Sequence, residues 1–276
     1  MVCKQKGIAL IQILLLVAVT SVFALYLTQQ ARAQVEKAAW AQARAASEVA
    51  IHSAESRLQF ELLTTDRVIR KTTSPLNFHG QPFIVNNEVE VAVQDQSGLL
   101  GLHFLRSGRF IALLKSQGIS DDRAQRISAV IRDWQDPDFI PSPYGRDASL
   151  DEAMIRNGNI PDITEIEKII TLTEQEKEII YANCTIFFNG DLNPITAPET
   201  LLNSMTGNNQ LTQQLINLRA NGQLDETTFR QMVSLRATDD LKYTVSNTMG
   251  IRYTHTNEYF SLTRETVVAL SPYASG

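Results

Sequence analysis

Four aspartates in the middle of the chain are the residues best suited by type and spacing to bind a cation. They are Asp133, Asp136, Asp138 and Asp147. Calcium takes several carboxylate and carbonyl oxygens from one loop, often with a glycine at the turn, and Gly145 is available for that role. The run therefore predicts a calcium site. The alternative is that these acids cap helices and face solvent.

Residue patterns typical of an enzyme are not found. The four histidines are scattered along the chain, at His52, His79, His103 and His255. None has the H-E-x-x-H spacing of a zinc site, and the chain has neither a G-x-S-x-G elbow nor a Walker loop. Cys184 lies in an apolar segment, which predicts a buried small side chain, and Cys3 near the N-terminus gives it no obvious disulfide partner. We predict structural or surface roles for these side chains and no catalytic site.

The charge distribution disfavours a nucleic-acid partner. The 276 residues carry a net charge of −5, and 43% of them are hydrophobic. Residues 1–33 contain Lys4, Lys6 and Arg32 and no acid, so the remainder carries −8. Nucleic-acid binding needs clustered lysine and arginine, which an acidic head does not offer. The apolar fraction predicts a folded protein with a core large enough for one or two domains.

One long helix is predicted for the first part of the chain. No glycine or proline occurs from Ile8 to Ser74, and Ser74-Pro75 ends the pattern. Residues 8–27 carry no charge, and a helix of this length spans about 30 Å, the thickness of a hydrocarbon core. Beyond them the segment is alanine-rich, and its apolar residues recur every three or four positions. They are Ala39, Ala43, Ala46, Ala50, Ala54, Leu58 and Leu62. We expect half of the helix in a membrane and half packed on the rest of the protein.

Three interpretations of this N-terminus stay open. The basic residues before the apolar run predict a cytoplasmic N-terminus and an exported head. An ordinary signal peptide would be cut after Ala31-Arg32-Ala33, and a plain anchor would not be cut at all. The third interpretation rests on residues 6–12, KGIALIQ, where a basic leader ends in glycine directly before the apolar run.

Those residues resemble the processing site of type IV pilins and pseudopilins. The resemblance implies cleavage by a prepilin peptidase between Gly7 and Ile8 and methylation of Ile8. Most members have a glutamate five residues into the mature chain, and Gln12 stands there in this sequence. A carboxylate in lipid is costly unless it is paired, and in a fibre it would pair with the amino group of a neighbouring subunit. A subunit without this glutamate suits the top of a fibre.

The remainder of the chain alternates between strand and helix patterns. Val89, Val91 and Val93 alternate with polar residues and predict a strand over 87–94. Helices follow from 109 to 181 and from 194 to 235, with a strand at 183–188 between them and two or three strands in 243–270. The predicted helix N-caps are Ser120, Thr164 and Thr173. Two units, around Gly118 and over 192–219, resemble helix-hairpin-helix motifs, but acids in the first one repel phosphate, so we expect packing units.

Five stretches extend the resemblance over nearly the whole chain, to the K-type minor pseudopilins of type II secretion, the general secretion pathway protein K family. They are 7–27, 80–98, 131–138 (IRDWQDPD), 159–165 and 192–202 (LNPITAPETLL). A missing glutamate at the position of Gln12 is typical of this family. The resemblance implies an α+β fold, with a long N-terminal helix packed on an antiparallel sheet and an inserted all-helical domain of helix-hairpin-helix-like units. The family is also known for calcium near the aspartates, although its longer acidic loop is abbreviated here.

The resemblance implies five segments and a role. The segments are a leader (1–7), a transmembrane half-helix (8–27), a first pilin-like part (28–108), a helical insertion (109–235) and C-terminal strands (236–276). It leaves open whether the strand near 183–188 joins the pilin sheet. The implied role is to initiate or cap a pseudopilus together with I- and J-type minor pseudopilins, and so to support export of folded proteins across the outer membrane. The protein would cross the inner membrane once, with a periplasmic head.

Two alternative functions remain. One is a minor pilin of a type IV pilus or a related fibre, which would share the N-terminus but would not need the inserted hairpins. The other is a membrane-anchored periplasmic binding module, whose sign would be a pocket with convergent polar groups.

Overall fold

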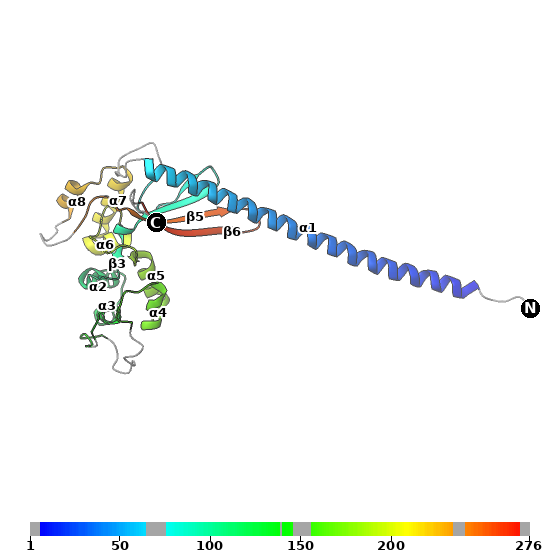
Figure 1. The fold of residues 1–276 in the computed structure, drawn as a ribbon, viewed down its shortest axis with the longest axis horizontal. Helices are drawn as coiled ribbons and strands as arrows, with labels where there is room; N and C mark the ends of the chain where they lie inside the picture. Colours follow the sequence, from blue (N-terminus) through cyan, green and yellow to red (C-terminus); the bar gives the residue numbers. More distant parts are fainter. Residues whose placement is uncertain (1–5, 65–75, 139, 146–155, 234–240, 271–276) are drawn as a thin grey trace, which may run out of the picture.

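The computed structural model describes residues 6–64, 76–138, 140–145, 156–233 and 241–270. Its first element is α1 (Lys6–Thr64), whose N-terminal half projects away from the head as a bare rod (Figure 1). The most apolar 18-residue window of α1 has a mean hydropathy of 2.7, and none of that window is buried. Within the described residues, α1 is the one helix long and apolar enough to cross a membrane. The predicted helix end at Ser74-Pro75 lies outside the described residues.

The C-terminal half of α1 packs on a sheet through a narrow stripe. Its buried residues are Ser47, Ala50, Ile51, Ala54, Leu58 and Leu62. The predicted stripe is therefore correct from Ala50 onward, but Ala46 is exposed. Ser47 takes its place because it follows Ala43 by a full four-residue step, whereas Ala46 falls on the outer side of the helix. The prediction of a buried Ala46 was wrong because alanine is common on both the buried and the exposed face of a helix.

The sheet has four antiparallel strands in the order β1-β2-β5-β6. The strands are β1 (Phe83–Val85), β2 (Val89–Asp95), β5 (Thr248–Thr256) and β6 (Ser261–Ala269). Val89, Val91 and Val93 are fully buried, as the alternation predicts, and Tyr253 pairs with Val91 on the neighbouring strand. Strands β5 and β6 lie within residues 243–270, where two or three strands are predicted. The sheet therefore joins residues before and after the helical insertion.

The insertion consists of short helices. They are α2 (Ser107–Ser116), α3 (Asp121–Gln135), α4 (Ile166–Ile169), α5 (Glu174–Asn183), α6 (Glu199–Thr206), α7 (Asn209–Ala220) and α8 (Glu226–Met232). The Ser120 side chain caps α3, and Thr173 forms a capping box with Glu176, both as predicted. Thr164 is not the cap of its segment. Asp162 accepts the hydrogen bond from the Thr164 amide and so begins a 3-10 turn before α4.

The two predicted hairpins are present and pack side by side. Gly118 joins α2 to α3 and Gly207 joins α6 to α7, with φ values of 87° and 61° that favour glycine. Helix α2 packs against both α3 and α6. The hairpins thus form the centre of the helical core, in agreement with a packing role.

The strand near 183–188 does not join the pilin sheet. Only Cys184–Thr185 forms a strand, β4, which pairs in parallel with β3 (Leu100–Gly101) in a separate two-stranded sheet. This small sheet belongs to the second of two hydrophobic cores, which extends from Leu100 to Val233. The first core lies between α1 and the four-stranded sheet. Helical packing therefore begins near residue 100, a few residues before the predicted start of the insertion at 109.

Candidate functional site

Helix α1 carries the residues of the predicted processing site. Gly7 and Ile8 lie in the first turn of α1, and the Gln12 side chain is exposed on its surface. The helix continues without a break through Ala31 and Ala33, where a signal peptidase would cut. None of these observations tests cleavage or methylation, which stay predictions.

The head is held together by a buried carboxyl group at the end of β2. Asp95 is completely buried and accepts hydrogen bonds from three separate segments of the chain. The donors are Ser97 N (3.0 Å), Ser97 Oγ (2.6 Å), Asn193 Nδ2 (3.4 Å), Thr196 Oγ1 (2.9 Å), Ser246 N (3.2 Å) and Ser246 Oγ (2.6 Å). The chain leaves the sheet at Asp95 and returns to it just after Ser246. This carboxyl group therefore joins the exit, the entry and the middle of the insertion.

Asp95 and its donors Ser97, Asn193, Thr196 and Ser246 form a junction between the sheet and the insertion, and further hydrogen bonds to backbone carbonyls strengthen it. The Asn193 amide donates to the Ser97 carbonyl at 2.7 Å, and Gln94 Nε2 donates to the Thr196 carbonyl at 3.0 Å. Gly98 lies so close that an added Cβ would come within 2.5 Å of the Thr196 carbonyl oxygen. Two of the family-like stretches, 80–98 and 192–202, thus meet here. Close packing at this point requires a residue without a side chain at position 98.

A half-buried histidine, His79, and a buried arginine, Arg219, lie beside this junction. Arg219 is 8% exposed and donates through Nη1 to the Ala197 carbonyl at 2.6 Å. Burial lowers the pKa of Arg219 to about 10. Burial, assisted by the charge of Arg219, lowers the pKa of His79 to about 4. His79 is thus neutral at physiological pH, and its protonation would place two cations together.

Two further family-like stretches meet inside the helical insertion. Trp134 Nε1 donates to Glu165 Oε1 at 2.8 Å, and Arg156 binds both oxygens of the same carboxylate at 2.5 and 2.7 Å. The bidentate contact with Arg156 lowers the pKa of Glu165. The aspartate-tryptophan stretch and the 159–165 stretch are therefore joined through one carboxylate, which again assigns them a structural role.

The acidic run divides into different environments. Asp133 is buried, and its Oδ2 accepts a hydrogen bond from Ser142 N at 2.9 Å. Asp136 is the C-cap of α3, and the exposed Asp138 accepts from Ile140 N at 2.8 Å. Asp147 lies outside the described residues. Within the residues that the structure describes, no three His, Cys, Asp or Glu side chains come close enough to share a metal ion.

Gly145 does shape this loop. An added Cβ at Gly145 would lie 2.0 Å from Asp133 Oδ2, so the loop can approach the carboxylate only with glycine there. Among the described residues, Asp133 is the buried carboxylate that the loop touches, and Asp138 lies exposed within the loop itself. The calcium site stays a prediction, and further ligands would have to come from loop carbonyls or from residues such as Asp147.

His255 and His103 contact groups far away in the sequence, whereas His52 is exposed on α1. His255 Nδ1 lies 2.9 Å from Ser47 Oγ, which resembles a nucleophile and its base, but Ser47 is fully buried and donates to the Ala43 carbonyl. His103 lies 2.8 Å from the Ile160 carbonyl oxygen, and His52 lies 3.8 Å from Glu55. Cys184 is buried as predicted, which raises the pKa of its thiol.

The sequence patterns do not single out Asp95 or Ser246, although one signal was present. Asp95 continues the odd-numbered series Val89, Val91 and Val93, so strict alternation places an acid on the buried face of β2. A buried acid needs several donors, and no pattern says which distant residues supply them.

We predict that Gly98→Ala destabilises the junction by roughly 1–3 kcal/mol, because its methyl group meets backbone that cannot move aside. Gly108→Ala is the matched control: its Cβ meets nothing within 4 Å, so it should be neutral or slightly stabilising. Denaturant unfolding of the full chain in detergent measures both. Trp40 contacts Phe260 at the end of the sheet and Trp134 packs against the helical core, so their fluorescence reports the two parts of the head separately. Equal stability of the two variants would contradict the assignment.

We also predict an acid-labile junction. The unfolded chain binds a proton at His79 near pH 6.5, whereas the folded chain resists protonation down to about pH 4. Stability contributed by neutral His79 is therefore complete above pH 6.5 and is lost as the pH falls toward 4, by roughly 1–3 kcal/mol. His79→Gln should flatten this part of the stability profile, and the exposed His52→Gln should not. An unchanged profile for His79→Gln would refute the prediction.

Comparison with known proteins gives a match at the level of structure. No family model and no curated protein matches the sequence. The fold of the chain is similar to that of a chain in a solved structure, the GspK-GspI-GspJ complex of the type 2 secretion system from enterotoxigenic Escherichia coli. The TM-score is 0.53 and the sequence identity is 18%. The match covers 86% of this chain and 93% of the solved chain. At this identity the likeness concerns the fold. The protein therefore has the α+β, pilin-like fold of the GspK pseudopilin, with a long N-terminal helix on an antiparallel sheet and an attached set of helices.

Proposed function

We propose that this protein is a minor pseudopilin of a type II secretion system that acts at the tip of the pseudopilus. The observation that carries the proposal is the extent of the structural match. It covers nearly all of both chains, so it includes the helical insertion as well as the helix and sheet. In this proposal the protein initiates or caps the fibre with I- and J-type partners and so supports export of folded proteins.

The insertion favours this role over that of an ordinary pilin. A minor pilin needs the long helix and the sheet, but it does not need a second hydrophobic core between β2 and β5. Here that core extends from Leu100 to Val233 and is bound to the sheet by a buried carboxyl group. A large helical unit on the head is compatible with a terminal subunit, which has no subunit stacked above it.

The features of α1 support a membrane-anchored, fibre-forming subunit. Its exposed apolar half can lie in the inner membrane before assembly, with the N-terminus in the cytoplasm and the head in the periplasm. A prepilin peptidase would remove residues 1–7 and Ile8 would be methylated. Gln12, without the carboxylate that would pair with the next subunit, is consistent with a place at the tip.

The alternatives make different predictions. A minor pilin of another fibre would recover different partners from the membrane. A membrane-anchored binding module would not be processed at Gly7 and would not need other pilin-like chains for its activity.

We predict that the mature protein begins at methylated Ile8. The measurement is the N-terminal mass of the full chain isolated from membranes that contain its native peptidase. Gly7→Leu should block cleavage and retain the leader, because the peptidase reads the small residue before the cut. Gly108→Leu provides a matched control on the head, where an added Cβ meets nothing within 4 Å. A mature chain that starts at Gln34, or an unprocessed wild-type chain, would overturn the pilin-like assignment.

Assembly is tested on the same material. The proposed tip subunit should co-purify from membranes with the I- and J-type minor pseudopilins of its own secretion system, in a stoichiometric complex. Co-purification with the subunits of a type IV pilus would instead support a role as a minor pilin of that fibre.

We also propose that calcium binds the loop after α3, with Asp133 as one ligand. The close approach of the loop to this carboxylate supports the proposal, because carboxylate and carbonyl oxygens on one loop are the ligands that calcium prefers. Millimolar calcium should raise the melting temperature of the full chain by a few degrees, and a chelator should reverse the change. Asp138→Asn and Asp147→Asn should reduce the shift, and Asp191→Asn, a distant exposed acid, should not. No shift at millimolar calcium would argue against the site.

A further inference from the structure

Three asparagines of the chain are followed directly by glycine, in Asn157-Gly158, Asn189-Gly190 and Asn221-Gly222. In such a pair the glycine nitrogen can attack the asparagine side chain, because glycine has no side chain to hinder the approach. A bond forms from this nitrogen to Cγ, and the bond from Cγ to Nδ2 breaks. Ammonia leaves with the proton that the glycine nitrogen loses. Water then opens the five-membered imide and gives aspartate or isoaspartate.

This reaction makes three demands on a folded chain. The glycine N–H must be free of hydrogen bonds, since its nitrogen is the nucleophile. The carboxamide must be able to turn toward the main chain. Negative charge develops on the side-chain oxygen during the attack, so water or another donor must reach that oxygen. The structure meets these demands differently at the three pairs.

The pair Asn221-Gly222 is held by hydrogen bonds at the end of α7. The Gly222 N–H donates to the Arg219 carbonyl at 2.9 Å, so the nucleophile is engaged. The Asn221 side chain donates through Nδ2 to the Asn217 carbonyl, also at 2.9 Å. Both bonds must break before the glycine nitrogen can reach Cγ.

The pair Asn157-Gly158 fails on the side-chain oxygen. Asn157 Oδ1 is buried and has no hydrogen-bond partner among the residues that the structure describes. The Asn157 N–H also donates to the Trp134 carbonyl at 3.1 Å, which fixes the main chain before the glycine. Charge that develops on a buried oxygen without a donor is strongly disfavoured, so this pair is protected.

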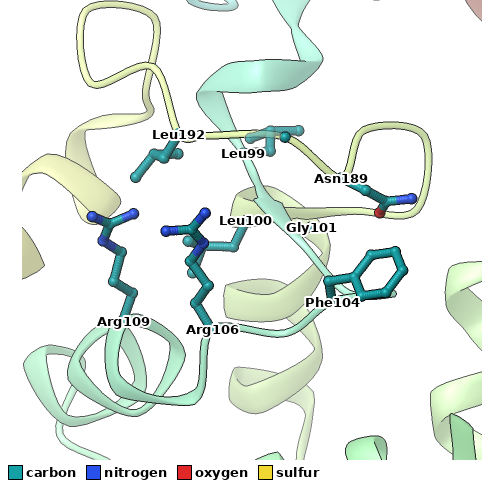
Figure 2. A pocket seen from close by; sticks show the side chains of 9 residues that line it. Leu99, Leu100, Gly101, Phe104, Arg106, Arg109, Asn189 and Leu192 are labelled. Atoms are coloured by element: carbon teal, nitrogen blue, oxygen red, sulfur yellow. The ribbon is translucent and has the colours of Figure 1, made fainter. Parts of the chain in front are cut away.

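The pair Asn189-Gly190 meets all three demands. Both residues are exposed, in the loop that follows β4. Within the described part of the chain, the Gly190 N–H makes no hydrogen bond. The hydrogen bond found for the Asn189 side chain is long, with 3.3 Å from Nδ2 to His103 Nδ1. In Figure 2 the Asn189 side chain projects from its loop on the side away from Arg106 and Arg109.

We propose that Asn189 is a site of spontaneous deamidation, and that it reacts ahead of the other two asparagine-glycine pairs. The reaction uses only the chain and water, so it needs no enzyme. The product carries a new negative charge directly before Gly190. The proposal does not depend on the identity of the fibre.

The isoaspartate product also lengthens the main chain by one carbon atom. The loop already touches the small sheet, because an added Cβ at Gly101 would lie 2.6 Å from the Phe188 carbonyl oxygen and 3.4 Å from Asn189 Cα. Four residues after Asn189, the Asn193 amide donates to the Ser97 carbonyl in the junction at 2.7 Å. An extra main-chain atom in this short, closely packed connection should displace Asn193. We therefore expect deamidation at Asn189 to weaken the junction.

The first test follows the three sites in one sample. The full chain is incubated in detergent at neutral pH, in water enriched in heavy oxygen, which labels the acids formed during the incubation. Peptide mapping by mass spectrometry then gives the rate at each asparagine. We expect Asn189 to react at least about tenfold faster than Asn157 and Asn221, the change in rate that 1.4 kcal/mol in the barrier produces. An equal or higher rate at either of the other two sites would overturn the proposal.

The same measurement on the denatured chain separates structure from sequence. In urea the three asparagines should react at similar rates, because the same glycine follows each of them and the protecting contacts are lost. If Asn189 keeps its full lead in the denatured chain, the structural explanation is wrong.

Variants test the consequence for the junction. Wild-type chain aged in this way should unfold at a lower denaturant concentration than fresh chain, whereas Asn189→Gln should age without this loss, because glutamine forms the cyclic imide far more slowly. Asn221→Gln is the matched control and should age like the wild type. Fresh Asn189→Asp carries the new charge with a main chain of normal length, so it should be as stable as fresh wild type. Equal ageing of Asn189→Gln and wild type, or a fresh Asn189→Asp as unstable as aged wild type, would contradict the proposed effect.

Discussion

Burial of the Asp95 carboxyl group is the constraint on which the arrangement of the head depends. A carboxyl group without access to water needs hydrogen-bond donors, and the donors here come from the residues that leave the sheet, enter it and lie midway through the insertion. Any rotation of the helical core relative to the sheet would break several of these bonds at once. Two hydrophobic cores that could otherwise move independently are therefore held in one geometry.

Other inward-facing carboxylates also join separate parts of the chain. Glu165 joins Trp134 to Arg156, and Arg123 binds both oxygens of Glu176, the residue that completes the capping box of α5. In each case a carboxylate is turned inward where helices too short to be stable alone must be held together. Trp134 and Glu165 belong to two of the stretches on which the sequence resemblance rests, and the structural match at 18% identity concerns the fold.

Helix α1 performs two tasks that place opposite demands on its residues. Its first half has apolar side chains on all sides and no protein contacts, which is suitable for lipid or for other helices of the same kind. Its second half has one buried stripe, and small residues such as Ala50 and Ala54 let it lie close on the sheet. The transition needs no change in backbone structure, so one continuous helix combines a segment long and apolar enough to cross a membrane with a segment packed on the sheet.

The sequence alone was sufficient for features that depend on neighbouring residues. The uninterrupted helix, the alternation of Val89, Val91 and Val93, and the caps at Ser120 and Thr173 follow from local periodicity and local hydrogen bonds. The resemblance supplied the α+β class and the insertion. Ala46 and Thr164 were misplaced because helix phase and the choice between adjacent caps depend on what packs nearby.

The tertiary structure alone decided the rest. It placed β4 beside β3 in place of the pilin sheet, brought Ser246 and Thr196 to Asp95, and set two arginines of α2 beside the 189–192 loop. These partners are separated by about 80 to 150 residues along the chain. No local pattern records such pairings, because they arise only when two cores have formed and their remaining polar groups must find one another.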